Sequence, residues 1–206
     1  MRSWLDILFP PRADETIVRH IIQDGFLALS SPHLTGKTHP DTVALLPFST
    51  SSVRAAIHEA KYHGSKQAFC LLAHTLADYL READDTTIGV RSVYLVPVPL
   101  GALRRKERGY NQVEEIANRA LHMLDGFTLD TTMLTRARET TSQVSLPRSQ
   151  RTENVRGAFK ATRPADPLST YIVLDDVLTT GATLQAVIDA LSTAGATQII
   201  PLALAH

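Results

Sequence analysis

Hydrophobic positions in the first 90 residues recur mainly at helical spacing, with polar segments between them. Apolar side chains that return every three or four residues mark one face of an amphipathic helix. This pattern predicts three helices, at residues 14–29, 51–64 and 66–82. Between the first two, residues 31–50 are rich in Pro, Ser, Thr and His, which predicts a connecting loop. Cys70 lies on the third helix and is expected to be a buried small hydrophobic residue.

From residue 91 onward, short apolar runs alternate with longer periodic segments. Continuous apolar runs are typical of parallel strands covered on both faces, and the periodic segments indicate helices. Strands are predicted at residues 91–99, 131–138, 157–161, 171–175 and 197–205, and helices at 111–124 and 182–193. Strand–helix–strand spacing favours parallel strands with right-handed crossovers. The predicted fold class is α/β, a mostly parallel sheet flanked by helices, with an N-terminal helical segment.

Length and composition narrow the class of protein. A chain of 206 residues with 44% hydrophobic residues can bury one sizeable core, so bulk disorder is excluded. One cysteine excludes a disulfide framework and a Cys-rich zinc module. The eight histidines show no ligand spacing, so no metal is assigned to them. The chain has no apolar run of transmembrane length and no secretory signal pattern, so we expect a cytoplasmic protein without membrane contact.

Charge is unevenly distributed although the formal net charge is zero. Residues 101–163 hold 12 basic and 7 acidic residues, whereas residues 164–206 hold four Asp and neither Lys nor Arg. A basic middle followed by an acidic end suggests one site with a part for anions and a part for a cation or hydroxyl groups. Chance clustering on a solvated face would give the same count, so the motifs must decide.

The most informative motif is an apolar strand that ends in two acids and leads into a helix. The stretch YIVLDDVLTTGATL places Asp175 and Asp176 at the carboxyl edge of a buried strand, where open α/β sheets bind their ligands. A tight turn through Gly181 then begins a helix whose first amide groups favour a phosphate. Adjacent carboxylates accept hydrogen bonds from sugar hydroxyls or hold Mg²⁺. A phosphorylated sugar would satisfy both parts.

This stretch resembles the phosphoribosyl-diphosphate-binding motif of type I phosphoribosyltransferases. The resemblance implies that Asp175 and Asp176 face the ribose, are the catalytic residues and hold Mg²⁺ through the ribose or water. It also implies a 5-phosphate-binding loop made, largely through backbone amides, by Leu178, Thr179, Thr180, Gly181, Ala182 and Thr183. On this basis residues 51–206 are predicted to form a type I phosphoribosyltransferase-like domain, and residues 1–50 a separate helical and loop segment.

Three further motifs resemble the competence protein F (ComF) family, whose members carry Pro-Val-Pro-Leu, a basic segment and then Arg-Gly-aromatic-Asn-Gln. The first motif runs from LVPVPL, which begins at Leu95, to RGYNQ, which ends at Gln112. The second is KYHG, which begins at Lys61, and the third is a block from Arg138 to Phe159. In type I enzymes the loop after this strand binds diphosphate, and cations there would neutralise the leaving group. The implied diphosphate-binding residues are Arg104, Arg105, Arg108, Gly109 and Asn111.

The resemblance also implies a loop that closes over the substrate, and the sequence departs from the family pattern at its N-terminal end. The polar, basic segment 138–156 lies between two predicted strands, where type I phosphoribosyltransferases carry a flexible loop that closes over the substrate. The implied lid residues are Arg138, Gln143, Arg151 and Asn154. A rigid surface helix near 147–155 is the alternative. The family commonly opens with a four-cysteine zinc ribbon, and no cysteine precedes Cys70 here, so that ribbon cannot form.

Three functions remain open from the sequence. The leading one is binding of 5-phosphoribosyl 1-diphosphate with Mg²⁺, with transfer of the phosphoribosyl group to an unidentified acceptor. Because the family is associated with natural transformation, a second function is non-catalytic handling of single-stranded DNA. The zero net charge argues against it, as does the small number of aromatic residues, only 12, that could stack on bases. A third is a sensor that binds the diphosphate without turnover. The oligomeric state is left open as well.

Overall fold

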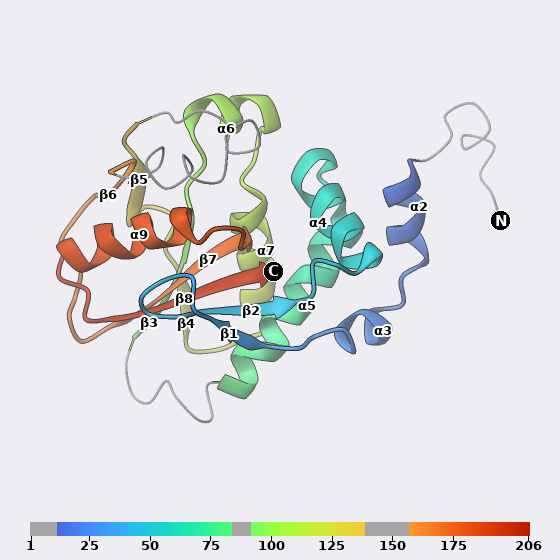
Figure 1. The fold of residues 1–206 in the computed structure, drawn as a ribbon, viewed down its shortest axis with the longest axis horizontal. Coiled ribbons are helices and arrows are strands. Elements are labelled where there is room, and N and C mark those ends of the chain that lie inside the picture. Colours follow the sequence, from blue (N-terminus) through green and yellow to red (C-terminus); the bar gives the residue numbers. More distant parts are fainter. Residues whose placement is uncertain (1–11, 84–91, 139–156) are drawn as a thin grey trace.

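A six-stranded, mostly parallel sheet forms the centre of the protein in the computed structural model, which describes residues 12–83, 92–138 and 157–206 (Figure 1). The strand order is β1-β2-β8-β7-β3-β4. The strands are β1 His33–Thr35, β2 Thr42–Leu46, β3 Val93–Pro97, β4 Phe127–Leu129, β7 Thr170–Val177 and β8 Gln198–Ala205. Every neighbouring pair is parallel except β1 and β2. A separate antiparallel hairpin is formed by β5 Leu134–Arg136 and β6 Phe159–Ala161.

Helices cover both faces of this sheet (Figure 1). One face packs against α4 Ser51–His63, α5 Lys66–Ala83 and α7 Gln112–Leu121, and the other against α9 Ala182–Thr193. The apolar run of the central strand β7 is continuous because both of its faces are buried. Ile172 and Leu174 point into the first core cluster, while Tyr171 and Val173 point into the second. The predicted fold class, a mostly parallel sheet flanked by helices, is confirmed.

The N-terminal region differs from the sequence prediction. Instead of one helix over 14–29, the chain forms α2 Ala13–His20 and α3 Gln23–Leu27. Ile21 and Ile22 between them have extended backbone, and β-branched residues favour that conformation. The predicted loop 31–50 contains β1 and β2. The TVALL run of β2 is short and does not alternate, because Ala44, Leu45 and Leu46 are all buried in the folded protein. The sheet therefore uses residues on both sides of position 50.

The remaining predictions differ mostly at the smallest elements. Helices α4, α5 and α9 match their predicted ranges, and Gly64 ends α4 with left-handed backbone as expected. Helix α6 Ala102–Arg108 and strand β4 were not predicted. Helix α6 buries none of its residues, so it lacks an apolar stripe to reveal it. Cys70 is exposed rather than buried, with its sulfur 3.8 Å from Nη1 of Arg119. No helix in the described segments is long and apolar enough to cross a bilayer.

Candidate functional site

A cavity of about 790 Å³ lies at the carboxyl edge of the sheet. Strands β3 and β7 are parallel neighbours, with Pro97 opposite Leu174, so the chain leaves both strands at this edge. Residues of α4 and α6 also line it, and both helices are labelled in Figure 1. The charged lining residues are Lys61, Arg104, Glu107, Arg108, Arg136, Asp175 and Asp176. Of the predicted site residues, the acidic pair, the whole 178–183 loop, Arg104 and Arg108 line this one cavity.

The two acids at the end of β7 have different surroundings. Asp175 is partly exposed, and its Oδ1 accepts a hydrogen bond from the backbone N–H of Asp176 at 2.9 Å. Burial and the neighbouring Asp176 charge raise the pKa of Asp175 to about 7. The pKa of Asp176 is lowered despite its burial, because Lys61 and Gln112 stabilise its charged form. The pair therefore combines an ionised carboxylate with one that gains a proton near neutral pH.

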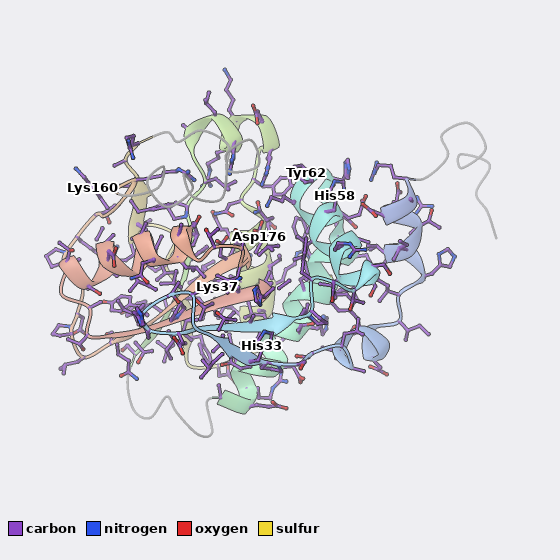
Figure 2. The ribbon with its side chains drawn as sticks, viewed as in Figure 1. His33, Lys37, His58, Tyr62, Lys160 and Asp176 are labelled. Carbon is purple, nitrogen blue, oxygen red and sulfur yellow. The ribbon has the colours of Figure 1, made fainter. Side chains whose placement is uncertain are left out.

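Lys61 and Gln112 both reach the same oxygen of Asp176. The Lys61 Nζ lies 2.9 Å from Asp176 Oδ2, and Gln112 Nε2 donates to this Oδ2 at 2.6 Å. Figure 2 shows Asp176 at the centre of the molecule and Tyr62 at the end of α4. Gln112 Oε1 in turn accepts from Arg108 Nη1 at 3.0 Å, and the Arg108 guanidinium lies 5.1 Å from the centre of the Tyr62 ring. Residues of α4, α6, α7 and β7 thus form one connected polar network.

The turn between β7 and α9 is held from outside by the β1–β2 loop. Gly181 has a φ of +80°, and a Cβ there would lie 2.5 Å from the Lys37 backbone oxygen. The Lys37 Nζ donates to the Thr179 carbonyl at 2.6 Å and to His206 Nε2 at 2.7 Å. The His39 N–H donates to Gln185 Oε1 at 2.8 Å. Gly181 is therefore required by the approach of Lys37, a contact that the sequence-based interpretation of this glycine did not include.

The predicted diphosphate residues outside the cavity lining make contacts of their own. Arg105 on α6 pairs with Glu114 at 3.5 Å. Gly109 ends α6 with a φ of +78°. Asn111 is buried; its Nδ2 donates to the Val98 carbonyl and its Oδ1 accepts from the Val113 N–H, both at 3.1 Å. Asn111 thus fixes the start of α7 to the chain leaving β3, which sets the position of the neighbouring Gln112.

The lid prediction falls mostly outside the described residues. Gln143, Arg151 and Asn154 lie there, and Arg138 is an exposed residue at the end of the described segment. Arg136, which the sequence analysis did not select, lines the cavity, and its guanidinium lies 5.2 Å from the centre of the Phe159 ring. Nothing in its local sequence distinguishes Arg136 from the other arginines of the basic segment.

Lys61 and Tyr62 are further cavity residues that the prediction did not select, although they belong to the KYHG motif. Gln112 belongs to the RGYNQ motif, whose residues were expected to be functional, and it contacts the acidic pair. These motifs meet in the structure: Tyr110 OH donates to the Ala60 carbonyl at 2.9 Å, and the Tyr110 ring packs over Gly64. Sequence reasoning could not join them, since it had no means of placing α4 beside α7.

Asp176 Oδ2 does not fit a divalent metal ion bound directly to it. Asp176 Oδ2 already accepts from Gln112 and contacts the Lys61 ammonium, and a divalent cation at this oxygen would face that charge at close range. Elsewhere in the described chain, His58, Glu59 and His63 bring potential ligand atoms within 4.8 Å, a proximity the histidine spacing had not suggested. Both oxygens of Glu59 accept from the Arg12 guanidinium, which competes with a cation there.

The central strand β7 thus delivers two acids and a helix-leading turn into a cavity lined by four cationic and three acidic side chains, the arrangement that the resemblance to type I phosphoribosyltransferases implied. Solved structures similar to the chain include hypoxanthine phosphoribosyltransferase from Staphylococcus aureus, with a TM-score of 0.41, 11% identity and coverage of 66% of this chain and 61% of that one. Adenine phosphoribosyltransferase from Leishmania tarentolae has a TM-score of 0.40 and 16% identity, over 84% of this chain and 79% of that one.

Curated proteins confirm the resemblance to the competence protein F family. DNA utilization protein YhgH of Salmonella typhi is 30% identical over 150 residues, which are 73% of this chain and 65% of that protein. Competence protein F of Haemophilus influenzae is 31% identical over 107 residues, 51% of this chain and 46% of that protein. The chain thus spans less than two thirds of the length of these homologues. No protein-family model matches it.

Proposed function

We propose that this protein binds 5-phosphoribosyl 1-diphosphate in the 790 Å³ cavity. The observation that carries the proposal is that Asp175, Asp176 and the complete 178–183 loop line the same cavity with four cationic side chains. The loop leads into α9, where backbone N–H groups are suited to a phosphate. The acids lie beside the loop, where they can accept from ribose hydroxyls. Arg104, Arg108 and Arg136 supply positive charge for the diphosphate.

The chemistry that such a site supports is displacement of diphosphate from C1 of the ribose. The bond from C1 to the diphosphate oxygen breaks, its electron pair leaves with the diphosphate, and an acceptor nucleophile forms the new bond to C1. The protein contributes by orienting the reactants and by stabilising the departing charge with the cavity arginines. In this proposal Mg²⁺ binds as the counter-ion of the diphosphate and is not coordinated directly by the acidic pair.

The test is calorimetric titration of 5-phosphoribosyl 1-diphosphate, with and without Mg²⁺, into the protein and into an Asp175→Asn/Asp176→Asn variant. We expect saturable binding to the wild type and a loss of at least about tenfold in affinity for the folded double variant, equal to about 1.4 kcal/mol. Diphosphate release in a screen of nucleobases and ammonia then tests transfer. Wild-type affinity in the double variant would contradict the assignment of the site.

A second candidate function is handling of single-stranded DNA, which the names of the homologues and one feature of the structure favour. Helix α6 buries no residue and presents the cations Arg104, Arg105, Lys106 and Arg108 beside the cavity. Binding of phosphates by such residues makes DNA binding steeply dependent on salt. An Arg105→Ala/Lys106→Ala variant should then weaken oligonucleotide binding and reduce the salt slope by about one for each phosphate that is no longer bound. An unchanged slope would exclude α6 as the DNA-binding surface.

A further inference from the structure

Lys61 brings a cation of the chain itself to the acidic pair. Its Nζ lies 2.9 Å from Asp176 Oδ2, and the side chains of Lys61 and Asp176 are 24% and 9% exposed. An ion pair with so little solvent is screened much less than a surface pair. Lys61 comes from α4, far in sequence from the strand that carries the acids, and it also lines the cavity.

The fold holds Lys61 in this place through the helix end that carries it. Gly64 ends α4 with left-handed backbone, one turn beyond the lysine. The Tyr110 OH donates to the Ala60 carbonyl at 2.9 Å, and the Tyr110 ring packs edge-on against Phe69, with ring centres 5.7 Å apart. Because α4 is fixed to the α6–α7 connection at this point, the Lys61 side chain starts from a defined backbone position close to β7.

The second partner of Asp176 leaves little room for a metal at the same oxygen. Gln112 Nε2 donates to Oδ2 at 2.6 Å, and Arg108 holds the other end of the Gln112 amide at 3.0 Å. A divalent cation on Asp176 would have to displace an amide donor and then lie beside an ammonium group. The other Asp176 oxygen and the Asp175 carboxyl remain suited to accept from neutral hydroxyl groups of a sugar.

We propose that Lys61 serves as the resident cation of this site, so that the acidic pair binds the hydroxyl groups of a ribose 5-phosphate without a divalent metal. The inference rests on the proposed function, because it concerns the same pocket, and it assigns Lys61 as a binding residue. Lys61 keeps Asp176 ionised and offsets its charge, which lets an anionic sugar phosphate approach. Removing the lysine leaves a carboxylate that a divalent cation can neutralise in its place.

The test uses ribose 5-phosphate, which lacks the diphosphate and therefore does not bring the metal with it. Binding to the wild type is measured by calorimetry in EDTA and in excess Mg²⁺, and the two dissociation constants should agree within about twofold. Lys61→Met should bind at least about tenfold more weakly in EDTA and regain most of that loss in Mg²⁺ or Mn²⁺. Lys61→Arg should remain insensitive to EDTA. Lys66→Met, at an exposed position on α5 outside the cavity lining, is the control and should behave as the wild type.

Electron paramagnetic resonance of Mn²⁺ measures metal binding without the sugar. Mn²⁺ should bind to the Lys61→Met variant, and adding Asp176→Asn to this variant should abolish the binding. The wild type should not bind Mn²⁺. Ribose 5-phosphate binding by the wild type that disappears in EDTA would overturn the inference, as would full affinity of a folded Lys61→Met in EDTA. If the wild type binds neither ribose 5-phosphate nor 5-phosphoribosyl 1-diphosphate in any condition, the proposed function itself fails. The wild-type comparison stands even if Lys61→Met does not fold.

Discussion

At the scale of single residues, this site depends on side chains whose roles differ although their local sequence is similar. Asp175 and Asp176 are adjacent, yet only Asp176 pairs with Lys61 and Gln112. Asn111 and Gln112 are adjacent as well, and only the glutamine reaches the acidic pair. In each case the neighbour on another element decides the role, because successive residues of a strand or loop point in different directions.

Gly181 offers the sharpest stability test. A Cβ at this position would lie 2.5 Å from the Lys37 carbonyl oxygen, in addition to the strain of a φ of +80°. Gly126 has nearly the same φ, +82°, with no atom within 4 Å of its would-be Cβ, so Gly126→Ala measures the strain alone. We expect Gly126→Ala to lower the free energy of unfolding by about 1–2 kcal/mol and Gly181→Ala by about 3 kcal/mol or more. Equal losses in urea denaturation would show that Lys37 does not restrict the turn.

The raised pKa of Asp175 leads us to expect that the stability of the protein depends on pH. Its pKa rises from an ordinary 3.8 to about 7 in the folded chain, so the folded state binds more protons than the unfolded state between these values. The contribution of Asp175 to the free energy of unfolding therefore falls as the pH rises through this window. Asp175→Asn should be more stable than the wild type near pH 8, by about 1–3 kcal/mol, and the advantage should fade toward pH 4. A constant difference across this range in thermal unfolding would contradict the assignment.

At the scale of elements, the site is completed by small elements that the sequence did not predict. The β1–β2 loop lies within a stretch predicted to be an irregular connection, and it packs on the phosphate turn through Lys37 and His39. Lys37, labelled in Figure 2, reaches the turn that follows β7 by donating to the Thr179 carbonyl. Helix α6, also unpredicted, supplies Arg104 and Arg108 to the cavity.

The β1–β2 loop should therefore affect phosphate binding. Lys37→Met removes the ammonium that donates to the Thr179 carbonyl, which holds the peptide group at the start of the turn. We expect affinity for ribose 5-phosphate to fall by about three- to tenfold, the loss of roughly one hydrogen bond's contribution to orientation. Lys66→Met, at an exposed position on α5, is the matched control. An unchanged dissociation constant in Lys37→Met, measured by calorimetry, would show that the turn keeps its geometry without this hydrogen bond.

At the scale of the whole molecule, the cavity lies where two core clusters meet. Leu174 of β7 packs with the α4, α5 and α7 side, whereas Val173 packs with the α9 side. The site takes Lys61 and Gln112 from the first side and the phosphate loop from the second. A ligand that contacts both groups of elements should stabilise the fold as a unit.

Thermal unfolding measures this coupling. At a ligand concentration of about 100 times Kd, binding adds about 2.7 kcal/mol to the free energy of unfolding. In a chain of this size each 1 kcal/mol corresponds to about 2–4 °C in Tm, so 5-phosphoribosyl 1-diphosphate should raise Tm by about 5–10 °C. At the same ligand concentration the Asp175→Asn/Asp176→Asn variant, which binds at least about tenfold more weakly, should gain about 1.4 kcal/mol at most, half of this rise or less. A similar rise in both proteins would place the ligand elsewhere.

The sequence by itself determined the long elements and the core of the candidate site. Helices α4, α5 and α9 carry a complete apolar stripe, and β7 is a continuous apolar run that leads into two acids and a turn. Such patterns reflect burial and backbone conformation, which residues near in sequence specify together. The acidic pair and the 178–183 loop were accordingly found without knowledge of the fold.

Only the tertiary structure decided which distant segments meet. It brought Lys61 of α4 and Gln112 of α7 onto one oxygen of Asp176, and it placed the Lys37 backbone against Gly181. Strand β2 and helix α6 carry too little periodicity to be predicted, since β2 is a short run buried without alternation and α6 buries none of its residues. Contacts between such segments depend on packing across the whole sheet, and local sequence does not encode them.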